Sequence, residues 1–360
     1  METGFIFKEF FERTIDTKNY ESRSDNRFVN ISKRENYLFN SSLNGIEEAD
    51  LIFLIGTNPR YEGTILNARI RKSYLNNNTK IYSLNENGDL TYPYESLDGH
   101  TQTLRNIFEG SHDLSKNIIN SKKPMIIIGE SFLRLNSAEI LYNMILEFLT
   151  QNKKLSKDWN PVNILSCDAS TVGNFDLGLI NQERNLLKDL KSNRFDVVYL
   201  VGQDNIDFIK KNEFVIYQGS HGDKGAEIAD IILPGSAYTE QDGHYTNLEG
   251  KVQKAYKASY PPGEAKEDWQ IINEIAEFMN NRKLFNDKDE LESSMFNYLN
   301  LQKEKQNKDL SIKSSAEFKN EKLIIDVKPY YFSNVIAKCS KTMIECNNSK
   351  LNLKSTGTEG

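Results

Sequence analysis

The feature that most constrains this chain is a series of short apolar runs, most of them ended by a glycine or a turn. Each run has the length of a β-strand, and uninterrupted apolar character indicates a strand buried on both faces, as in a parallel sheet. Segments with helical spacing lie between the runs, and this alternation is typical of α/β folds. We therefore predict doubly wound, mostly parallel sheets in two Rossmann-like lobes, followed by a C-terminal helical tail. The runs cover 51–55, 125–128, 162–165, 197–201, 214–217 and 228–233.

The clearest helices are predicted at 139–152 and 264–280, where apolar residues recur every three or four positions. At the start of the first helix, Asn136 and Glu139 have the spacing of a capping box, in which two side chains satisfy free N–H groups. Helices of this kind suit the outer layers of an α/β lobe.

Changes in composition predict boundaries along the chain. After residue 281 the sequence is rich in Lys, Glu, Asn, Asp and Ser, which is typical of a solvated helix and linker. Near the C-terminus, Cys339 and Cys346 fall on the apolar stripe of a predicted helix, where packing is the ordinary role of a free cysteine. The predicted parts are an N-terminal extension (1–45), a first α/β lobe (46–120), a second α/β lobe (121–283), a polar linker (284–322), and a C-terminal amphipathic helix with a disordered tail (323–360).

Composition excludes several kinds of function. The chain has 360 residues and a formal net charge of -6, whereas a nucleic-acid surface needs clustered excess Lys and Arg, so we expect no nucleic-acid partner. No apolar run approaches the roughly 20 residues of a membrane helix, so any attachment to a membrane would run through partners. The cysteines form no Cys-x-x-Cys pair and the histidines are scattered, which predicts no metal or iron–sulfur site in this chain.

The first candidate site is the turn of Gly56, Thr57 and Asn58, which follows the first apolar run. A glycine turn at the carboxyl edge of a sheet can present backbone N–H groups to a phosphate or a pterin. The same residues would equally form an ordinary turn between a strand and a helix.

The second candidate site is the loop 234–253, which is dense in turn formers and short polar side chains behind an apolar strand. Glu240 and Glu249 flank an Asp-Gly pair, so their carboxylates would converge if that pair closes a hairpin. Without a ligand they would bind backbone amides of the same loop. Asn247 is the remaining polar candidate.

Segment 229–253 resembles the signature of the molybdopterin oxidoreductase superfamily, in which a strand ending in proline precedes a Glu-x-x-Gly and an Asn-x-Glu-Gly. Further blocks resemble, in order, the family of large iron–sulfur subunits of respiratory complex I. These blocks are 36–40, 45–50, 56–62, 66–72, 110–112, 122–124, 217–226, 261–263, 267–269 and 337–343. On this resemblance, the relic positions of a pterin pocket are Gly56, Thr57, Asn58, Glu240, Asn247 and Glu249.

The resemblance implies that the chain supports electron transport without a catalytic residue, metal or cofactor of its own. It implies a structural, non-redox subunit of the peripheral, matrix-side arm of complex I at the mitochondrial inner membrane, where NADH reduces ubiquinone. Members of this family begin with a cysteine-rich region that holds iron–sulfur clusters, and that region is missing from the sequence. We therefore expect a split subunit, with the clusters in a separate N-terminal half and contacts to other peripheral-arm subunits, including the flavin module.

The alternative is an active molybdopterin oxidoreductase, such as a formate dehydrogenase-like catalytic subunit. Active relatives hold molybdenum or tungsten through a Cys, selenocysteine or Ser and carry a neighbouring cluster. The first cysteine of this chain is Cys167, so its N-terminal part offers no thiolate ligand.

Overall fold

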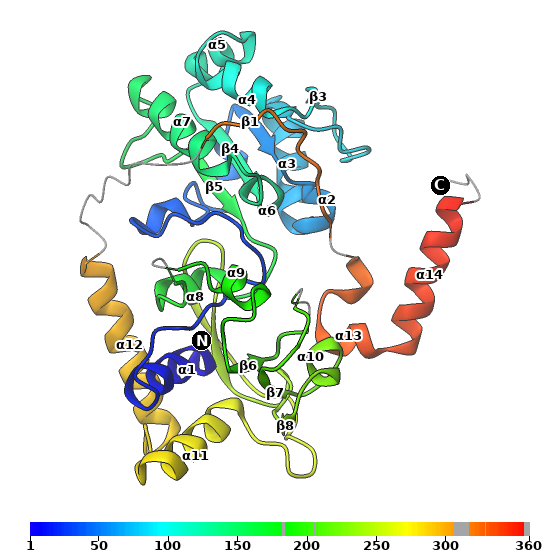
Figure 1. Ribbon diagram of the computed structural model, residues 1–360. Coiled ribbons are helices and arrows are strands. Elements are labelled where there is room, and N and C mark those ends of the chain that lie inside the picture. The colour runs from blue at the N-terminus through cyan, green and yellow to red at the C-terminus, as the bar shows by residue number, and fades with distance from the viewer. Residues whose placement is uncertain (182–183, 205, 207, 306–316, 328, 356–360) are drawn as a thin grey trace.

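The protein forms two lobes joined by extended segments (Figure 1). The computed structural model describes residues 1–360 except 182–183, 205, 207, 306–316, 328 and 356–360. The predicted α/β class with mostly parallel sheets is confirmed. In the described part of the chain, no helix is long and apolar enough to cross a lipid bilayer.

The first lobe is built around a five-stranded sheet in which all neighbouring strands are parallel. Its order, β3-β2-β1-β4-β5, is that of a doubly wound Rossmann-like sheet. Strands β1 and β4 are buried along their whole length, as their apolar runs predict. The strands are β1 (Leu51–Ile55), β2 (Lys80–Ser83), β3 (Glu95–Ser96), β4 (Pro124–Gly129) and β5 (Val162–Leu165).

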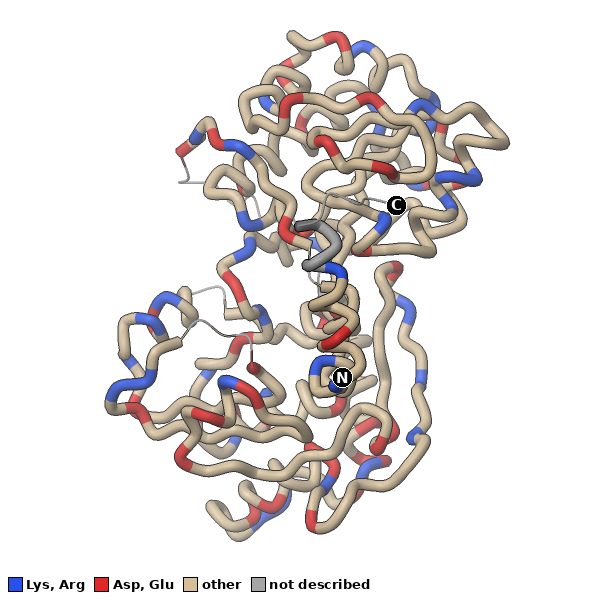
Figure 2. Tube along the Cα trace, turned by 90° about the vertical axis from the view of Figure 1, so that its right-hand side faces the viewer, with Lys and Arg blue, Asp and Glu red and all other residues tan. Residues whose placement is uncertain are grey.

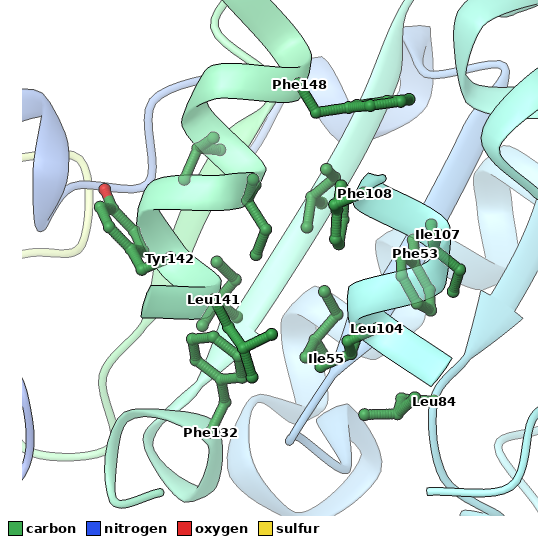
Figure 3. Close-up of a cluster of buried hydrophobic side chains, with 14 of the residues drawn as sticks. Phe53, Ile55, Leu84, Leu104, Ile107, Phe108, Phe132, Leu141, Tyr142 and Phe148 are labelled. Atoms are coloured by element: carbon green, nitrogen blue, oxygen red, sulfur yellow. The ribbon is translucent and has the colours of Figure 1, made fainter. Parts of the chain in front are cut away.

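Alternate side chains of this sheet enter two separate hydrophobic cores, because successive residues of a strand point to opposite faces. Phe53 and Ile55 lie on the face covered by α4 and α7, near side chains such as Leu104 and Phe148 (Figure 3). Ile52 lies in the core on the opposite face, which α3 covers. The helices of this lobe are α2 (Pro59–Glu62), α3 (Thr64–Asn77), α4 (Thr101–Phe108), α5 (Asp113–Asn120), α6 (Glu130–Leu133) and α7 (Ala138–Gln151), with the short 3₁₀ helices η1 (Arg34–Asn36) and η2 (Gly45–Glu48) before β1.

The second lobe contains a smaller parallel sheet, β6-β7-β8, and an antiparallel hairpin of β9 and β10. Val198 and Val215 face a core that includes Leu190 of α9, whereas Tyr199 faces the core formed by α1, α11 and α12. The strands are β6 (Val197–Val201), β7 (Phe214–Gly219), β8 (Ile231–Pro234), β9 (Gly243–Thr246) and β10 (Val252–Ala255). The helices are α1 (Glu2–Arg13), α8 (Thr171–Asp176), α9 (Leu186–Lys191), α10 (Lys224–Glu227), α11 (Asp268–Asn280) and α12 (Lys288–Lys305).

Strand β8 differs from its prediction. The apolar run 228–233 predicts a strand buried on both faces, but Ile231 and Ile232 are 45% and 56% exposed. The strand lies at the edge of the three-stranded sheet, and neither side chain joins a hydrophobic core of the described residues, so no packed layer covers its two faces. The composition of the run fits a central strand equally well, and its position in the sheet cannot be read from it.

A segment from the start of the chain packs in the second lobe, and a segment from its last part packs on the first lobe. Helix α1, near the N-terminus, packs in the second lobe, where Phe5 and Ile6 join a core with Ile272 and Met295. Residues 317–327, which we call the strap, instead run across the first lobe (Figure 1). Each lobe is therefore completed by a segment from the far end of the sequence.

The strap is bound to the first lobe by both packing and hydrogen bonds. Leu323 is 1% exposed and belongs to the same core as Phe53, and its N–H donates to the carbonyl of Gly99 (2.8 Å). The carbonyl of Glu321 accepts from the N–H of Thr101 (3.0 Å), and its carboxylate accepts from the N–H of Ser137 (3.2 Å). Because α4 and α7 both begin without a side-chain cap of their own, Glu321 satisfies free N–H groups at the start of both helices.

The lobe boundary lies elsewhere than the composition predicts. Strands β4 and β5 fall within the predicted second lobe (121–283), yet β4 pairs directly with β1. The predicted linker (284–322) contains α12, whose Leu291 and Met295 are buried in the second lobe, and the first part of the strap. A helix with one narrow apolar stripe among many charges is readily mistaken for a solvated linker.

The structure also bears on the predictions for the start of α7 and for the C-terminal helix and tail. The N-cap of α7 is Ser137, and no capping box of Asn136 and Glu139 forms, because Glu321 takes that role. The predicted C-terminal helix is two helices separated at Ser340, whose extended backbone ends the first of them. The tail predicted to be disordered, at 356–360, lies outside the described residues. The remaining elements are η3 (Tyr330–Phe332), α13 (Val335–Cys339) and α14 (Lys341–Ser355).

Candidate functional site

The turn of Gly56, Thr57 and Asn58 lies at the carboxyl end of β1, the edge at which doubly wound folds bind ligands. Gly56 has a positive φ of 65°, and a Cβ there would approach the backbone nitrogen of Phe132 to 2.6 Å, so only glycine fits. The side chain of Asn58 accepts from the N–H of Arg60 (3.2 Å) and thereby caps α2. The turn is thus a close strand-to-helix connection.

The polar groups of this turn are bound to a carboxylate of the same chain. The hydroxyl of Thr57 and the N–H of Asn58 both donate to Oε2 of Glu62 (2.6 Å each). The thiol of Cys167, just beyond β5, donates to Oε1 of the same side chain (3.5 Å). Burial raises the pKa of Glu62, and the neighbouring carboxylate of Glu130 raises it further.

Glu130, directly after β4, is a second carboxylate at this edge, and unlike the half-buried Glu62 it is fully buried. It is 1% exposed and accepts from the N–H of Cys167 (3.1 Å). The guanidinium groups of Arg27 and Arg134 form ion pairs with it. Burial would lower the pKa of Arg27, but its partners Asp25 and Glu130 raise it on balance. We call Glu62, Glu130, Arg27 and Cys167 the edge cluster.

A small pocket adjoins the edge cluster. It is lined on one side by Glu130 and Ser166, at the ends of β4 and β5, and on the other by residues 27–30 and 36–37. The edge cluster was not among the residues that sequence patterns indicate. Glu62 lies in a block that resembles the complex I family, but nothing in the sequence placed its side chain back on the turn or near Glu130.

The second loop makes the predicted contact with its own backbone at Glu240 but not at Glu249. Glu240 accepts from the N–H of Ala237 (2.9 Å), and Asn247 accepts from the N–H of Glu249 (3.1 Å). Glu249 also reaches the first lobe, where its Oε1 accepts from the N–H of Leu43 (2.8 Å). The loop is therefore a structural bridge between the lobes.

The residues of the two candidate loops do not come together in one site. The hairpin of β9 and β10 turns at 247–251, whereas Gly243 pairs with Ala255 in the ladder, so the Asp-Gly pair does not close it. Within the described residues, no hydrogen bond joins Glu240 or Glu249 to the turn at Gly56–Asn58.

Arg34 makes the strongest part of the bridge. Its guanidinium binds both carboxylate oxygens of Asp176 (2.8 Å each) and donates to the carbonyl of Gly250 (2.9 Å). Gly250 has a φ of 79°, and a Cβ there would come within 2.4 Å of the guanidinium. The hydroxyl of Tyr37 also donates to Asp176 (2.8 Å). This bridge holds the end of the signature loop against the N-terminal segment.

His244 binds Glu2, a contact that the sequence does not predict. Ligand atoms of Glu2, His244 and Glu292 lie within 4.8 Å of one another. The N–H and Nδ1 of His244 bind Glu2 (2.9 and 2.5 Å), and Glu292 pairs with Lys254 (3.3 Å). These contacts already account for the three side chains as a link between α1, β9 and α12.

Comparison with known proteins adds a family and a set of relatives. The sequence model of the family described as molybdopterin oxidoreductase matches residues 1–278. The NADH-ubiquinone oxidoreductase 75 kDa subunit of Reclinomonas americana is 36% identical over 370 residues, covering 96% of this chain and 53% of the relative. The 78 kDa subunit of Candida albicans is 38% identical over 330 residues (87% and 45%), and an NADH-quinone oxidoreductase subunit of Rickettsia bellii is 34% identical over 362 residues (99% and 52%). The chain spans about half the length of these relatives.

Proposed function

The chain belongs to the molybdopterin oxidoreductase family, and on this premise we propose that it is a structural, non-redox subunit of mitochondrial respiratory complex I. Its relatives are named as subunits of NADH-ubiquinone or NADH-quinone oxidoreductases, which favours this function over that of a formate dehydrogenase-like catalytic subunit. The proposed place is the peripheral, matrix-side arm, held at the inner membrane by other subunits.

The observation that carries the proposal is the edge cluster. A molybdopterin is anionic and bears phosphate, so its site needs free N–H donors or cations at the carboxyl edge of the sheet. Here the donors of Thr57 and Asn58 are bound to Glu62, and the Arg27 guanidinium is paired with Glu130. The charge of the Arg134 guanidinium is likewise taken up by Asp25 and Glu130. The residues present do not fit the family's cofactor.

Cysteine content supports the same conclusion for iron–sulfur clusters. A cluster of the common types is held by four ligands, usually cysteine thiolates, and the chain has 3 cysteines. Cys167 lies in the first lobe, whereas Cys339 and Cys346 lie on α13 and α14. Electrons would then pass through clusters held by a partner.

We propose that this partner is a separate polypeptide that corresponds to the cluster-bearing part of the longer relatives. The chain would pack against it, keep water from the electron path and contact neighbouring subunits, including the flavin module. The low effective dielectric of a dry contact strengthens the electrostatic control of buried redox groups. No catalytic step falls to the residues of this chain.

Purification of the intact assembly through an affinity tag on this chain tests the function. We expect the eluate to oxidise NADH with ubiquinone, to contain a distinct polypeptide with cysteine-rich cluster motifs, and to lack stoichiometric molybdenum and tungsten by elemental mass spectrometry. Stoichiometric molybdenum or tungsten bound to the chain would refute the proposal. An active complex that lacks this chain would refute it as well. An active complex without a separate cluster-bearing polypeptide would refute the split alone.

A further inference from the structure

The C-terminal arm, residues 335–355, has a composition unlike the rest of the protein. It carries Lys338, Lys341, Lys350 and Lys354 against the single acid Glu345, although the whole chain has a net charge of -6. A short basic segment on an acidic protein points to an acidic binding surface, because complementary charge steers and orients association.

The arm is a pair of helices with little support from the body of the protein. Helix α14 packs mainly against α13 and η3, and in Figure 1 it stands beside the two lobes. Met343 and Ile344 are 38% and 39% exposed. An isolated helix of this length is marginal in water, and the run Asn347-Asn348-Ser349 has low helix propensity.

Two exposed contacts fix where the arm lies. Lys338 pairs with Asp223 of the second lobe (2.5 Å), and the Lys350 ammonium lies 5.0 Å from the centre of the Tyr61 ring in the first lobe. Exposed pairs of this kind contribute at most about 1 kcal/mol each, so they orient the arm without burying it.

A second basic helix, α3, follows directly after α2, the helix that carries Tyr61. Helix α3 carries Arg69, Arg71 and Lys72 with no acidic residue, and Ile65 near its start is 76% exposed. Arg69 and Lys72 share the single carboxylate of Glu47, which leaves excess positive charge. In the charge view of Figure 2, basic and acidic residues elsewhere are interspersed along the chain.

We propose that the C-terminal arm, together with α2 and the start of α3, is the docking surface for a neighbouring protein subunit that presents an apolar groove edged by Asp and Glu side chains. The groove would cover Met343, Ile344 and Ile65, and its carboxylates would pair with Lys341 and Lys350. This proposal rests on the function proposed above, because it requires an assembly of unlike subunits. A lipid surface fits less well, since helices that lie on membranes separate a wide apolar face from a charged one, and α14 mixes its few apolar residues with polar ones on all sides.

The test introduces charge reversal on the arm of the tagged full chain. We expect K341E/K350E to lower recovery of the chain in the complex at least about tenfold and to make the remaining binding less sensitive to salt. The matched control is K153E/K157E, which makes the same change in net charge at two exposed residues after α7. A second variant, I344D, tests the apolar part of the surface without changing a lysine.

The outcomes separate this inference from the proposed function. If wild type is absent from the complex, the proposed function fails. If wild type is recovered and K341E/K350E is recovered equally well, only the docking surface is refuted. Light scattering that shows a dimer lost in K341E/K350E, or arm-dependent sedimentation with vesicles of phosphatidylcholine and cardiolipin in equal amounts, would assign the arm to a second copy or to a lipid surface and overturn the proposal. A melting temperature like that of wild type confirms that each variant is folded.

Discussion

Glu62 is a half-buried carboxylate at the end of α2, next to the turn that follows β1, and this partial burial raises its pKa. A raised pKa in the folded state means that the protonated form contributes stability below the unfolded value of about 4.5, and that this contribution is lost as pH rises through the folded pKa. The difference in unfolding free energy between wild type and Glu62→Gln should therefore shift in favour of the glutamine variant as pH rises. Urea denaturation over a series of pH values measures this difference.

Glu47 provides the matched control for the pH series. Its pKa is lowered, chiefly by the hydrogen bond from Lys72, so its contribution is present above the unfolded value and disappears as pH falls through the folded pKa. Glu47→Gln should thus show the opposite slope to Glu62→Gln. A flat profile for Glu62→Gln would mean that the carboxylate is not held in a dry setting.

Single residues of the candidate site were predictable only in part. The sequence predicted that Glu240 and Glu249 bind backbone amides of their own loop. The prediction is confirmed for Glu240, which accepts from Ala237, but is wrong for Glu249, whose backbone partner is Leu43 in the N-terminal segment. The edge cluster was not predictable. Glu62, Glu130 and Arg27 meet through the fold, and nothing in their spacing along the chain reports it.

At the scale of elements, the strap behaves as part of the core of the first lobe. Leu323→Ala removes a side chain that is 1% exposed and should destabilise the lobe by about 2–5 kcal/mol. Ile324→Ala changes the next residue, which is 76% exposed, and should alter stability by no more than about 0.5 kcal/mol. Chemical denaturation of both variants measures the contrast. Equal effects would show that the strap does not pack on the lobe in solution.

Elements with strong local patterns were predicted well, and elements that depend on distant neighbours were not. The runs that form β1, β4 and β5 are mainly apolar, and all three strands are buried in the first-lobe sheet. Helix α7 was predicted at 139–152 and spans Ala138–Gln151, but its cap comes from Glu321, far away in the sequence. The exposure of β8 reflects the lack of a packed layer over its faces, which its own residues do not encode.

At the scale of the whole molecule, the bridge through Gly250 couples the two lobes. Gly250→Ala forces a residue with a Cβ to adopt a positive φ and displaces the Arg34 guanidinium from the buried Asp176. Loss of a partner from a buried pair costs about 3–5 kcal/mol, and we expect calorimetry to resolve separate unfolding transitions for the two lobes.

Gly263→Ala is the control for backbone strain alone. Gly263 also has a positive φ, of 58°, but no atom lies within 4 Å of an added Cβ. Its replacement should cost only about 1–2 kcal/mol and leave the lobes coupled. If both glycine variants unfold like wild type, the bridge does not couple the lobes.

Two lobes of α/β type follow from the order of apolar runs, but the way the chain divides between them does not. Boundaries were predicted near residue 120 and, from composition, near 284. Neither point is a lobe boundary, because the sheet continues through the first and a packed helix follows the second. Helix α1 packs in the second lobe and the strap in the first, and no periodic pattern in the sequence predicts either placement.

Leu323 joins a core whose other fully buried members lie between Leu51 and Ile164. On the ribosome, where chains grow by about 5–20 residues per second, the first lobe must wait on the order of ten seconds after Ile164 is made before this side chain arrives. During that interval the apolar surface that Leu323 will cover stays exposed to water and to other chains. Folding of the first lobe should therefore depend on a chaperone that shields this surface until Leu323 has been made.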